Sequence, residues 1–551
     1  MGFNLVLSRS KSLLVLFVSI LAPILLSACS IPFGKPLLDY LSPRQSKSGI
    51  EPRDPANASP APYVAPGIGP PASGRLEVSL SEAILIGLSN NKSFDVQKFK
   101  PPITSLGEEV ERSVFDPVLK SEVNTNRKKT NQESVGRGFS ASTSVTELLP
   151  TGTTLDVLLS TGYAKGETPV IGQSSGDPFT DTATENKYWT TFTQISVNQA
   201  LLRGAGIQAN LANLRKARIE TQVSSYELTG LAQTLAGEIE SAYWEYLLAL
   251  MRVDIQEKGL ALSSRLVRET KQRIKSGQKA EYEMYSLLAQ ESSTRQALSD
   301  AKSLQEKTRI RLLKLISPPS FDLWNRQLKL LTRPTLPPDS VEDLASHINV
   351  AMRMRPDLNQ ARLEEQKGTL EIVKTKNGLL PKLDAFLMFG RTGYSKNFDL
   401  SLKDYGSGGG GLDYTARIQF EFPVMNRKAK ADYNRSVLEL ARSRQAIDNL
   451  VQLAQQEVLL AYVEVKRAKD QIRLSDETIK YQLLKRDAEI EKYRLGTSNA
   501  FTVAQAERET ITSQLSAAQA RIDYLRGLTQ FYIADGSLLF RRGVGVLVAD
   551  P

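Results

Sequence analysis

The chain has 551 residues, of which 41% are hydrophobic, and a formal net charge of +10. This length is sufficient for a large core, and the presence of one cysteine excludes a disulfide within the chain. Lysine and arginine are interleaved with glutamate and aspartate instead of forming a basic patch. The positive charge therefore argues for solvated helix faces and against nucleic-acid binding.

The segment 1–28 has the organisation of an export signal. Arg9 and Lys11 precede an apolar run over residues 13–26. As a helix this run would measure about 21 Å, which is short for a hydrocarbon core of about 30 Å, so we expect it to be removed. The Leu-Ser-Ala-Cys sequence that follows resembles the lipobox of bacterial lipoproteins. This resemblance implies that Cys29 is diacylated and becomes the mature N-terminus, whereas an ordinary secretory signal with an incidental cysteine is the alternative.

Residues 29–75 are expected to form an extended tether. Ten prolines lie between Ser30 and Gly74 among alanine, serine and glycine, a composition that cannot bury enough apolar surface to fold. In the lipoprotein resemblance, Ser30 in place of aspartate after the cysteine implies an anchor in the outer membrane. Two acyl chains would hold the protein there stably, since each buried methylene contributes about 0.8 kcal/mol.

The rest of the chain contains an internal duplication. The segment around Pro117 is similar to the segment around Pro381, and the segment around Gly277 is similar to the segment around Gly496. These landmarks come in the same order in both copies, but Pro117 and Gly277 are further apart along the chain than Pro381 and Gly496. The first copy therefore carries extra sequence, mostly between Pro117 and Ile195. We divide this part of the chain into a first repeat, a Pro-rich linker, a second repeat and a C-terminal tail, with the ranges 76–320, 321–340, 341–539 and 540–551.

Each repeat predicts one very long helix followed by a shorter helix that returns. No proline interrupts 207–275 or 428–494, and each segment would extend roughly 100 Å as a helix. Gly277 and Gly496 end these segments, because glycine accepts the positive φ at which a chain leaves a helix. Apolar residues at alternating intervals of three and four predict a coiled-coil seam of Val437, Leu440, Arg444, Ile447, Val451, Ala454, Val458, Ala461, Val465, Ala468 and Ile472. A similar stripe in the first repeat consists of Leu228, Leu231, Leu235, Ile239, Ala242, Tyr246 and Val253.

Before each long helix the sequence predicts β-strands. The apolar members of two alternating patterns are Tyr414, Ala416, Ile418, Phe420 and Phe422, and Leu383, Ala385, Leu387 and Phe389. Strands of about ten residues with this alternation suit a transmembrane barrel, although a half-buried soluble sheet has the same pattern. Residues 138–163 are predicted to form an additional hairpin that turns at Pro150 to Gly152. The sequence does not decide whether this hairpin joins the barrel. Because the smallest membrane barrels have about eight strands, four to six strands per chain require several chains to share one.

The region from about Leu76 to Leu539 resembles the TolC-like outer-membrane efflux proteins. The matching features are the duplication, the first helices with NNKS and RPDL, the entry ISVNQALLRGAG into the first long helix, and the glycine turns in IKSGQK and RLGTSN. The resemblance implies a mostly α protein with β-structure, in which three chains form one transmembrane β-barrel continued by a periplasmic α-helical coiled-coil barrel. It also implies a periplasmic adaptor protein and an inner-membrane pump as partners.

The same resemblance implies functional residues at the glycine turns. The tips that would dock the adaptor are Gly277, Gln278, Leu495, Gly496 and Thr497. Relatives with a charged gate carry two aspartates shortly after the second tip glycine, and here these positions hold Thr502 and Gln505, so an acidic ring is absent. If these two residues form an aperture gate, they close it by hydrogen bonds and side-chain bulk. Solvent-facing residues of an ordinary coiled coil are the alternative.

Three features that could signal another activity have simpler interpretations. Gly204 to Ala209 fits a dinucleotide-binding fingerprint with Glu227 downstream, but the helix that follows is too long for a Rossmann crossover, so the glycines are predicted to allow a sharp strand-to-helix entry. His347 is the only histidine and is expected to be solvated or locally paired beside Asp343. Residues 406–411 lack the lysine of a phosphate-binding loop and are predicted to form a flexible hairpin loop. We therefore expect no catalytic residue, metal or cofactor.

Together these features predict the outer-membrane channel component of a tripartite efflux or type I secretion system. Such a protein would be lipid-anchored in the bacterial outer membrane, extend far into the periplasm and conduct substrates from the pump complex to the exterior. The sequence does not distinguish among drugs, metals and secreted proteins as the substrate. The alternative is a lipid-anchored coiled-coil scaffold of the cell envelope, which would explain the anchor and the heptads but not the strands.

Overall fold

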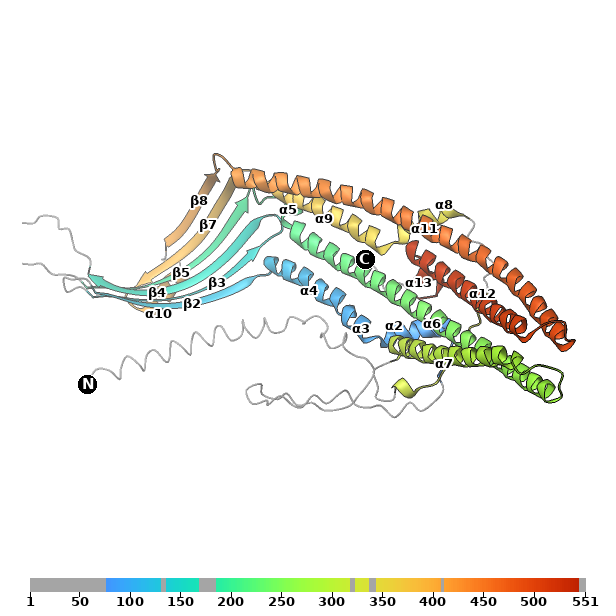
Figure 1. Ribbon diagram of the computed structural model, residues 1–551. Coiled ribbons are helices and arrows are strands. Elements are labelled where there is room, and N and C mark those ends of the chain that lie inside the picture. The colour runs from blue at the N-terminus through green and yellow to red at the C-terminus, as the bar shows by residue number, and fades with distance from the viewer. Residues whose placement is uncertain are drawn as a thin grey trace, which may run out of the picture. The chain divides into compact units, whose positions relative to one another are not determined.

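The computed structural model describes residues 76–129, 135–167, 185–317, 323–335, 343–407 and 411–544. The predicted export signal, Cys29 and the tether lie outside these ranges, as do parts of the linker and of the C-terminal tail. All described residues belong to one unit, Gly69–Pro551, in which a β-sheet adjoins a layer of long helices (Figure 1).

The two repeats have the same order of elements. The first contains α2 (Leu80–Asn90), α3 (Lys92–Lys98), α4 (Lys100–Arg112), β2 (Val118–Lys129), β3 (Val135–Leu148), β4 (Thr153–Glu167), β5 (Glu185–Ala200), α5 (Ile207–Asn210), α6 (Ala212–Lys275) and α7 (Glu283–Ile316). The second contains α8 (Leu344–Met354), α9 (Pro356–Gly378), β7 (Lys382–Ser395), α10 (Phe398–Ser407), β8 (Gly411–Glu421), α11 (Arg427–Arg494), α12 (Ala500–Ala534) and α13 (Leu538–Arg541). This order confirms the predicted sequence of helix, strands, long helix, turn and returning helix.

The strands form one antiparallel sheet in the order β2-β3-β4-β5-β7-β8. The hairpin predicted within 138–163 is present as β3 and β4, and it lies inside this sheet between β2 and β5. Its turn contains Gly152 at φ = 86°, a conformation that glycine adopts at little cost. Among the described strands, β2 and β8 each have one neighbour, so both outer edges of the sheet are open.

The register gathers apolar residues of all six strands on one face of the sheet. Phe389 of β7, for example, is directly opposite Ile195 of β5 and Tyr414 of β8. The large exposed members of this apolar face are Leu119, Val123, Val145, Val157, Leu159, Ile195, Leu387, Phe389, Leu412, Tyr414, Ile418 and Phe420. The alternation predicted from the sequence is confirmed, and it produces a broad apolar surface that faces solvent in the single chain.

A short helix, α10, interrupts the connection between β7 and β8. It packs on the apolar face of the sheet, where the hydroxyl groups of Ser401 and Thr191 lie 3.1 Å apart. The prediction of a flexible loop over 406–411 is therefore partly wrong, because the first two of these residues belong to α10. Contact with the sheet stabilises this helix, and the local sequence does not reveal that contact. Residues 408–410 lie outside the described ranges.

Four helices form a layer that continues the sheet, in the order α4, α6, α9 and α11. Ion pairs join each helix to the next: Arg218 to Glu108 at 2.8 Å, Lys216 to Glu371 at 2.6 Å and Arg444 to Glu365 at 2.8 Å. Because α4 leads into β2 and α11 follows β8, the helical layer and the sheet end on the same two sides. The unit thus has two matching open sides, one at β2 and α4 and the other at β8 and α11.

The long helices agree with the prediction except at their starts. The first predicted helix is divided at Leu211, so that a four-residue α5 precedes the 64 residues of α6. Gly204 and Gly206 have φ of 87° and 99°, which confirms that glycines allow the sharp entry from β5. The second helix, α11, has 68 residues and begins at Arg427, just before the predicted start.

The predicted coiled-coil seam of α11 is confirmed only in its second half. The members from Ala454 to Ile472 are buried, whereas Val437 and Arg444 are exposed. The reason is a change of partner along the helix: Leu440 packs against Gly368 of α9, and the buried half packs against α12. In the stripe of the first repeat, Leu231 is likewise exposed.

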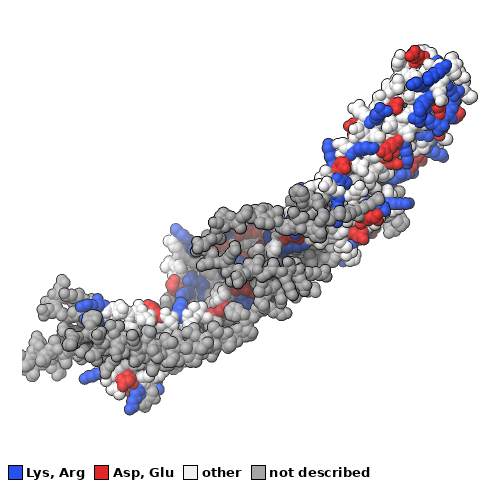
Figure 2. Space-filling view, turned by 90° about the horizontal axis from the view of Figure 1, so that it is seen from below, with Lys and Arg blue, Asp and Glu red and all other residues white. Residues whose placement is uncertain are grey.

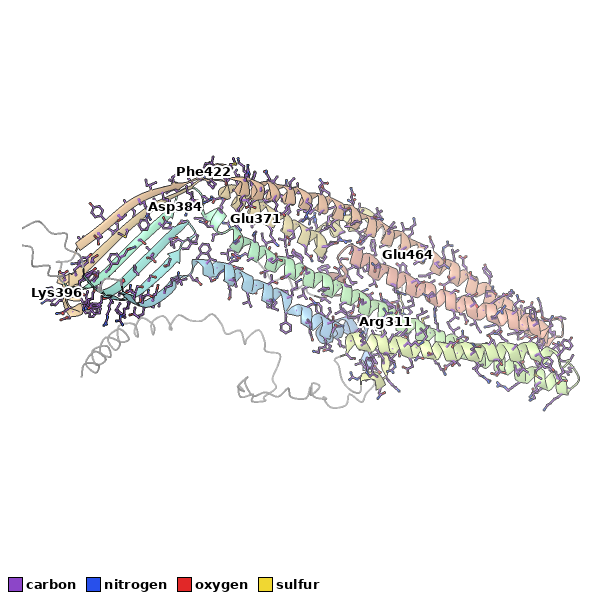
Figure 3. All side chains as sticks on the ribbon, turned by 60° about the vertical axis from the view of Figure 1, so that its left-hand side comes forward. Arg311, Glu371, Asp384, Lys396, Phe422 and Glu464 are labelled. Carbon is purple, nitrogen blue, oxygen red and sulfur yellow. The ribbon has the colours of Figure 1, made fainter. Side chains whose placement is uncertain are left out.

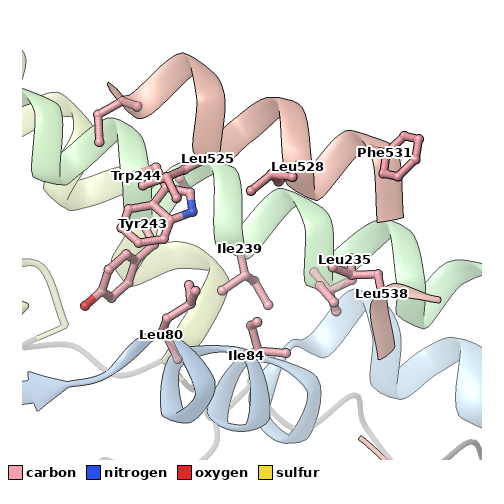
Figure 4. Close-up of a cluster of buried hydrophobic side chains, with 14 of the residues drawn as sticks. Leu80, Ile84, Leu235, Ile239, Tyr243, Trp244, Leu525, Leu528, Phe531 and Leu538 are labelled. Atoms are coloured by element: carbon pink, nitrogen blue, oxygen red, sulfur yellow. The ribbon is translucent and has the colours of Figure 1, made fainter. Parts of the chain in front are cut away.

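The largest core lies where α2, α6, α12 and α13 meet (Figure 4). Ile239, Tyr243, Phe531 and Leu538 are fully buried there. Two short parallel strands, β1 (Leu76–Val78) and β6 (Leu328–Leu330), pair beside this core, and the Tyr243 hydroxyl donates to the carbonyl of Val78 at 3.3 Å. Since β6 lies within the predicted linker, that segment is packed against the helices where the structure describes it.

Candidate functional site

The turn between α6 and α7 is closed by backbone hydrogen bonds around a glycine. Gly277 has φ = 75°, and its N–H donates to the carbonyl of Ile274 at 3.0 Å. The N–H of Gln278 donates to the carbonyl of Arg273 at 2.9 Å. This pair of bonds is the Schellman motif, in which a left-handed residue allows the last helical carbonyls to be satisfied.

The turn between α11 and α12 has the same geometry in the second repeat. Gly496 has φ = 84° and donates to the carbonyl of Tyr493 at 3.2 Å, and Thr497 donates to the carbonyl of Lys492 at 2.9 Å. Nothing lies within 4 Å of the position that a Cβ would take at either glycine. Both predicted tips are therefore present as exposed turns whose glycines are required by backbone conformation and not by crowding.

The two tips lie side by side and contact one another. The hydroxyl groups of Thr270 and Tyr493 are 2.9 Å apart, and both side chains are buried. Arg273 donates to the carbonyl of Arg494 at 2.9 Å, which places a cation at the C-terminus of α11 where the helix dipole favours it. The ammonium of Lys279 lies 4.6 Å from the centroid of the Tyr493 ring. The tips thus form one joint surface.

Large apolar side chains project from this tip surface. Leu495 is 79% exposed, and Tyr282, Tyr285 and Phe501 are each at least 65% exposed. Leu495 was predicted from the sequence, whereas the three aromatic residues were not. Their exposure depends on which side of each helix faces the other hairpin, since Tyr493 is also aromatic and close to a tip glycine but is buried.

The two predicted gate residues have local hydrogen-bond partners. The backbone N–H of Thr502 donates to the side chain of Asn499 at 2.9 Å, and its hydroxyl donates to the same oxygen at 3.0 Å. Asn499 is the N-cap of α12, so Thr502 helps to start that helix. Gln505 is exposed and donates to Glu509 at 3.0 Å.

A buried carboxyl lies just beyond Thr502 and Gln505 on the same helix. Glu507 is 2% exposed, and burial raises its pKa to about 7 although Arg486, 4.0 Å away, opposes this shift. Its Oε2 atom has no hydrogen-bond partner among the described residues. This group was not predicted from the sequence, because burial of one glutamate in a helix depends on how that helix packs against its neighbours.

The RPDL sequence forms a structural clamp. The guanidinium of Arg355 donates to both carboxylate oxygens of Asp357 at 3.0 and 2.6 Å, and also to Glu457 at 2.5 Å and to the carbonyl of Ala534 at 3.1 Å. Burial opposes ionisation of both groups, but the hydrogen bonds outweigh it and lower the pKa of Asp357. The clamp joins the start of α9 to α11 and α12.

The single histidine has a partner far away in the sequence. Its Nδ1 atom lies 2.8 Å from the carboxylate of Asp535, which is fully buried and also accepts a hydrogen bond from the backbone N–H of Ser537 at 2.8 Å. Asp343 instead caps the start of α8. The prediction that His347 is solvated or paired beside Asp343 is therefore wrong, since the contact with Asp535 at the end of α12 depends on tertiary packing.

The junction of sheet and helices combines apolar and basic residues. Phe422, which Figure 3 labels, is exposed at the end of β8, and Val424 and Met425 are exposed between it and α11. A surface pocket beside them is lined by five cations, Arg203, Lys374, Arg427, Lys428 and Arg435, and by three carboxylates, Glu371, Asp432 and Glu439, so cations are in excess. Elsewhere on the helices, basic and acidic side chains are interspersed (Figure 2), in agreement with the sequence pattern.

The described residues show neither a membrane-spanning helix nor a cluster of metal ligands. No helix in those ranges has the length and apolarity that a transmembrane helix needs. The same ranges contain no group of three or more histidine, cysteine, aspartate or glutamate side chains placed to hold a metal ion.

Comparisons with known proteins agree on one group of relatives. The family model "Outer membrane efflux protein" matches residues 347–537. A search of curated protein sequences found no match. Among solved structures, the CmeC outer membrane channel of Campylobacter jejuni is 12% identical with a TM-score of 0.59, covering 83% of this chain and 86% of its own.

Two further structures have the same fold. The outer membrane protein VceC of Vibrio cholerae is 12% identical with a TM-score of 0.59, covering 83% of this chain and 96% of its own. The MtrE outer membrane channel of Neisseria gonorrhoeae in its open state is 16% identical with a TM-score of 0.56, covering 84% of this chain and 89% of its own. The described chain therefore has the fold of outer-membrane channels.

Proposed function

We propose that the chain is an outer-membrane channel component of a tripartite efflux or type I secretion system, because residues 347–537 match the outer membrane efflux protein family model and the described chain shares the fold of outer-membrane channels. It conducts substrates from a pump complex that spans the periplasm to the exterior. The observation that carries this proposal is the six-stranded sheet with one exposed apolar face and two open edges, joined to helices that end in an exposed tip surface.

The apolar face suits lipid as its solvent. A membrane cannot satisfy the N–H and C=O groups of open strand edges, so β2 of one copy must pair with β8 of another. Three copies then close the barrel, and the matching edges at α4 and α11 close the helical layer beneath it. A lipid-anchored scaffold would have no need for an exposed apolar sheet, which argues against that alternative.

The junction between sheet and helices fits the boundary between lipid and water. Its exposed Phe422, Val424 and Met425 would lie in the apolar layer, and the neighbouring cations would face anionic headgroups. The lipid anchor at Cys29 would hold the same chain to the outer membrane. These assignments place the helices in the periplasm.

The tip surface is the proposed docking site for the periplasmic adaptor. It contains the predicted residues Gly277, Gln278, Leu495, Gly496 and Thr497 and the exposed aromatic residues beside them. Apolar side chains ringed by polar ones are typical of protein interaction sites. Thr502 and Gln505, in the first two turns of α12, would form the aperture gate and close it by hydrogen bonds and side-chain bulk.

A mass measurement and a crosslinking experiment test the proposal. In mild detergent the mature protein should have the mass of three chains, and a stable monomer would contradict the assembly. A photo-crosslinking residue in place of Leu495 should capture the adaptor. The same residue in place of Leu460, which is also exposed but lies on α11 far from the tip, should not. Equal capture at both positions would contradict docking at the tips.

A further inference from the structure

The two repeats differ in the number of strands between their helices. In the second repeat, β7 follows α9 and β8 leads to α11, with no other strand between them among the described residues. In the first repeat, β2 follows α4 just after Pro117, as β7 does after Pro381, and β5 leads to the long helix as β8 does. The hairpin β3–β4 therefore has no counterpart and corresponds to most of the extra sequence of the first repeat.

This inserted hairpin is a full part of the sheet. Val145 of β3 is directly opposite Leu119 of β2 and Val157 of β4. Pairing continues along β4 and β5 from Thr153 opposite Gln199 to the far ends of both strands. Since the ladders are continuous on both sides of the hairpin, it separates β2 from β5 along their whole length.

The turn of the hairpin is also built into the start of the helical layer. The side-chain amide of Asn210 in α5 donates to the carbonyl of Pro150 at 3.0 Å and to that of Gly204 at 2.9 Å. A Cβ at Gly152 would lie 2.2 Å from the carbonyl oxygen of Gly204, so only glycine allows this approach. These contacts hold the hairpin at the base of the sheet.

The side chains of the hairpin continue both faces of the sheet. Val145, Val157 and Leu159 extend the exposed apolar face. The opposite face carries Ser140, Ser142, Ser144 and Ser160. A hairpin that folded away from the barrel would not need apolar and polar faces in register with its neighbours.

The widths of the two layers agree. At a spacing of about 4.8 Å and a tilt of about 40°, each strand takes about 6 Å of barrel circumference, so six strands take about 38 Å. Four helices at about 9 Å each take about 36 Å. Six strands are thus compatible with the helical layer of α4, α6, α9 and α11.

Building on the proposed trimeric channel, we propose that the inserted hairpin widens the pore in the outer membrane to a barrel of eighteen strands, six from each chain. Its backbone diameter is about 36 Å, against about 24 Å for the twelve strands that would remain without the hairpin. With side chains of about 5 Å on each side, the polar lumen is about 26 Å wide. A lumen of this width admits bulky substrates. Selection of substrates by size then takes place at the helical end of the conduit.

Distances between spin labels in the assembled protein test this inference. A single label at Met388, on the face of β7 opposite the exposed Leu387 and Phe389, is introduced into the full chain with Cys29→Ser and another export signal. Three symmetric backbone sites lie about 31 Å apart in an eighteen-stranded barrel and about 21 Å apart in a twelve-stranded one. Because the labels project into the lumen, about 5 Å inside the backbone, the labels themselves lie about 23 Å and about 12 Å apart. The matched variant lacks residues 130–167, which removes two strands and leaves β2 and β5 antiparallel with every side chain on its original face.

We expect the distance between labels to fall from about 23 Å in the full chain to about 12 Å in the deletion variant. A trimer whose full-length distance is already about 12 Å would overturn the wide barrel and leave the proposed channel intact. A mass other than three chains would overturn the trimeric assembly itself, and with it this inference. If the deletion variant does not accumulate, the full-length distance still decides between the two barrels.

Discussion

Replacing Glu507 by glutamine should make the tip of the second helical hairpin more stable at neutral and alkaline pH. Glu507 is buried between α11 and α12 with one oxygen unpaired among the described residues. Its nearest cation is Arg486 at 4.0 Å, and the neighbouring Asp487 opposes ionisation. Glutamine has nearly the same shape and is neutral at every pH, so the substitution removes the cost of a buried charge while the packing stays.

The size of the effect follows from the pKa of the carboxyl. Burial raises the pKa of Glu507 to about 7, against a usual value of 4.5. Between these values the folded state holds a proton that the unfolded state releases, so the free energy of unfolding falls as the pH rises. Above pH 7 the whole cost of about 3 kcal/mol is present, and below pH 4.5 it is absent.

Hydrogen exchange of the backbone amides in residues 500–515 measures this difference. At pH 8 the Glu507→Gln variant should exchange about 100-fold more slowly than the unmodified protein, and at pH 4, below the usual pKa of the carboxyl, the two should nearly coincide. Glu509→Gln is the matched control, because Glu509 lies at the surface and a hydrogen bond from Lys485 lowers its pKa. Equal protection in the Glu507→Gln variant and the unmodified protein at pH 8 would refute the reasoning.

Three further predictions concern the anchor, the membrane face and the tips. Cys29→Ser should abolish incorporation of labelled fatty acid, and unchanged labelling would remove the lipoprotein assignment. Ile418→Lys, on the apolar face of β8, should destabilise the membrane-embedded oligomer by about 2 to 4 kcal/mol. Gln419→Lys, on the opposite face, should not. Similar heat stability of the two variants would contradict the assignment of faces. Gly277→Val combined with Gly496→Val should still yield inserted oligomer, since the left-handed backbone costs only about 1 to 2 kcal/mol per site, but should lose export and adaptor crosslinking. Normal export by a well-expressed double variant would count against a docking role.

The sequence by itself determined the features that depend on local physics. The long helices follow from uninterrupted helical periodicity, and their ends follow from Gly277 and Gly496, which need a positive φ that other residues avoid. The strands with one apolar face follow from a period of two, which each segment carries on its own. The internal duplication also predicted the order of these elements, because equivalent landmarks recur in the same order in both copies.

Other features were decided only by tertiary structure, because they depend on segments that are far apart in the chain. The seam of α11 is buried where it faces α12 and exposed at Val437 and Arg444, since its first half faces α9 instead. The partner of His347 is Asp535, in the last part of the chain, and α10 exists where the sheet offers it a surface. Likewise, a hairpin such as β3–β4 is recognisable from its turn and its alternation, but its place in the sheet depends on pairing with β2 and β5. Strand pairing between distant segments is a property of the folded chain, so only the tertiary structure could show that this sheet has six strands.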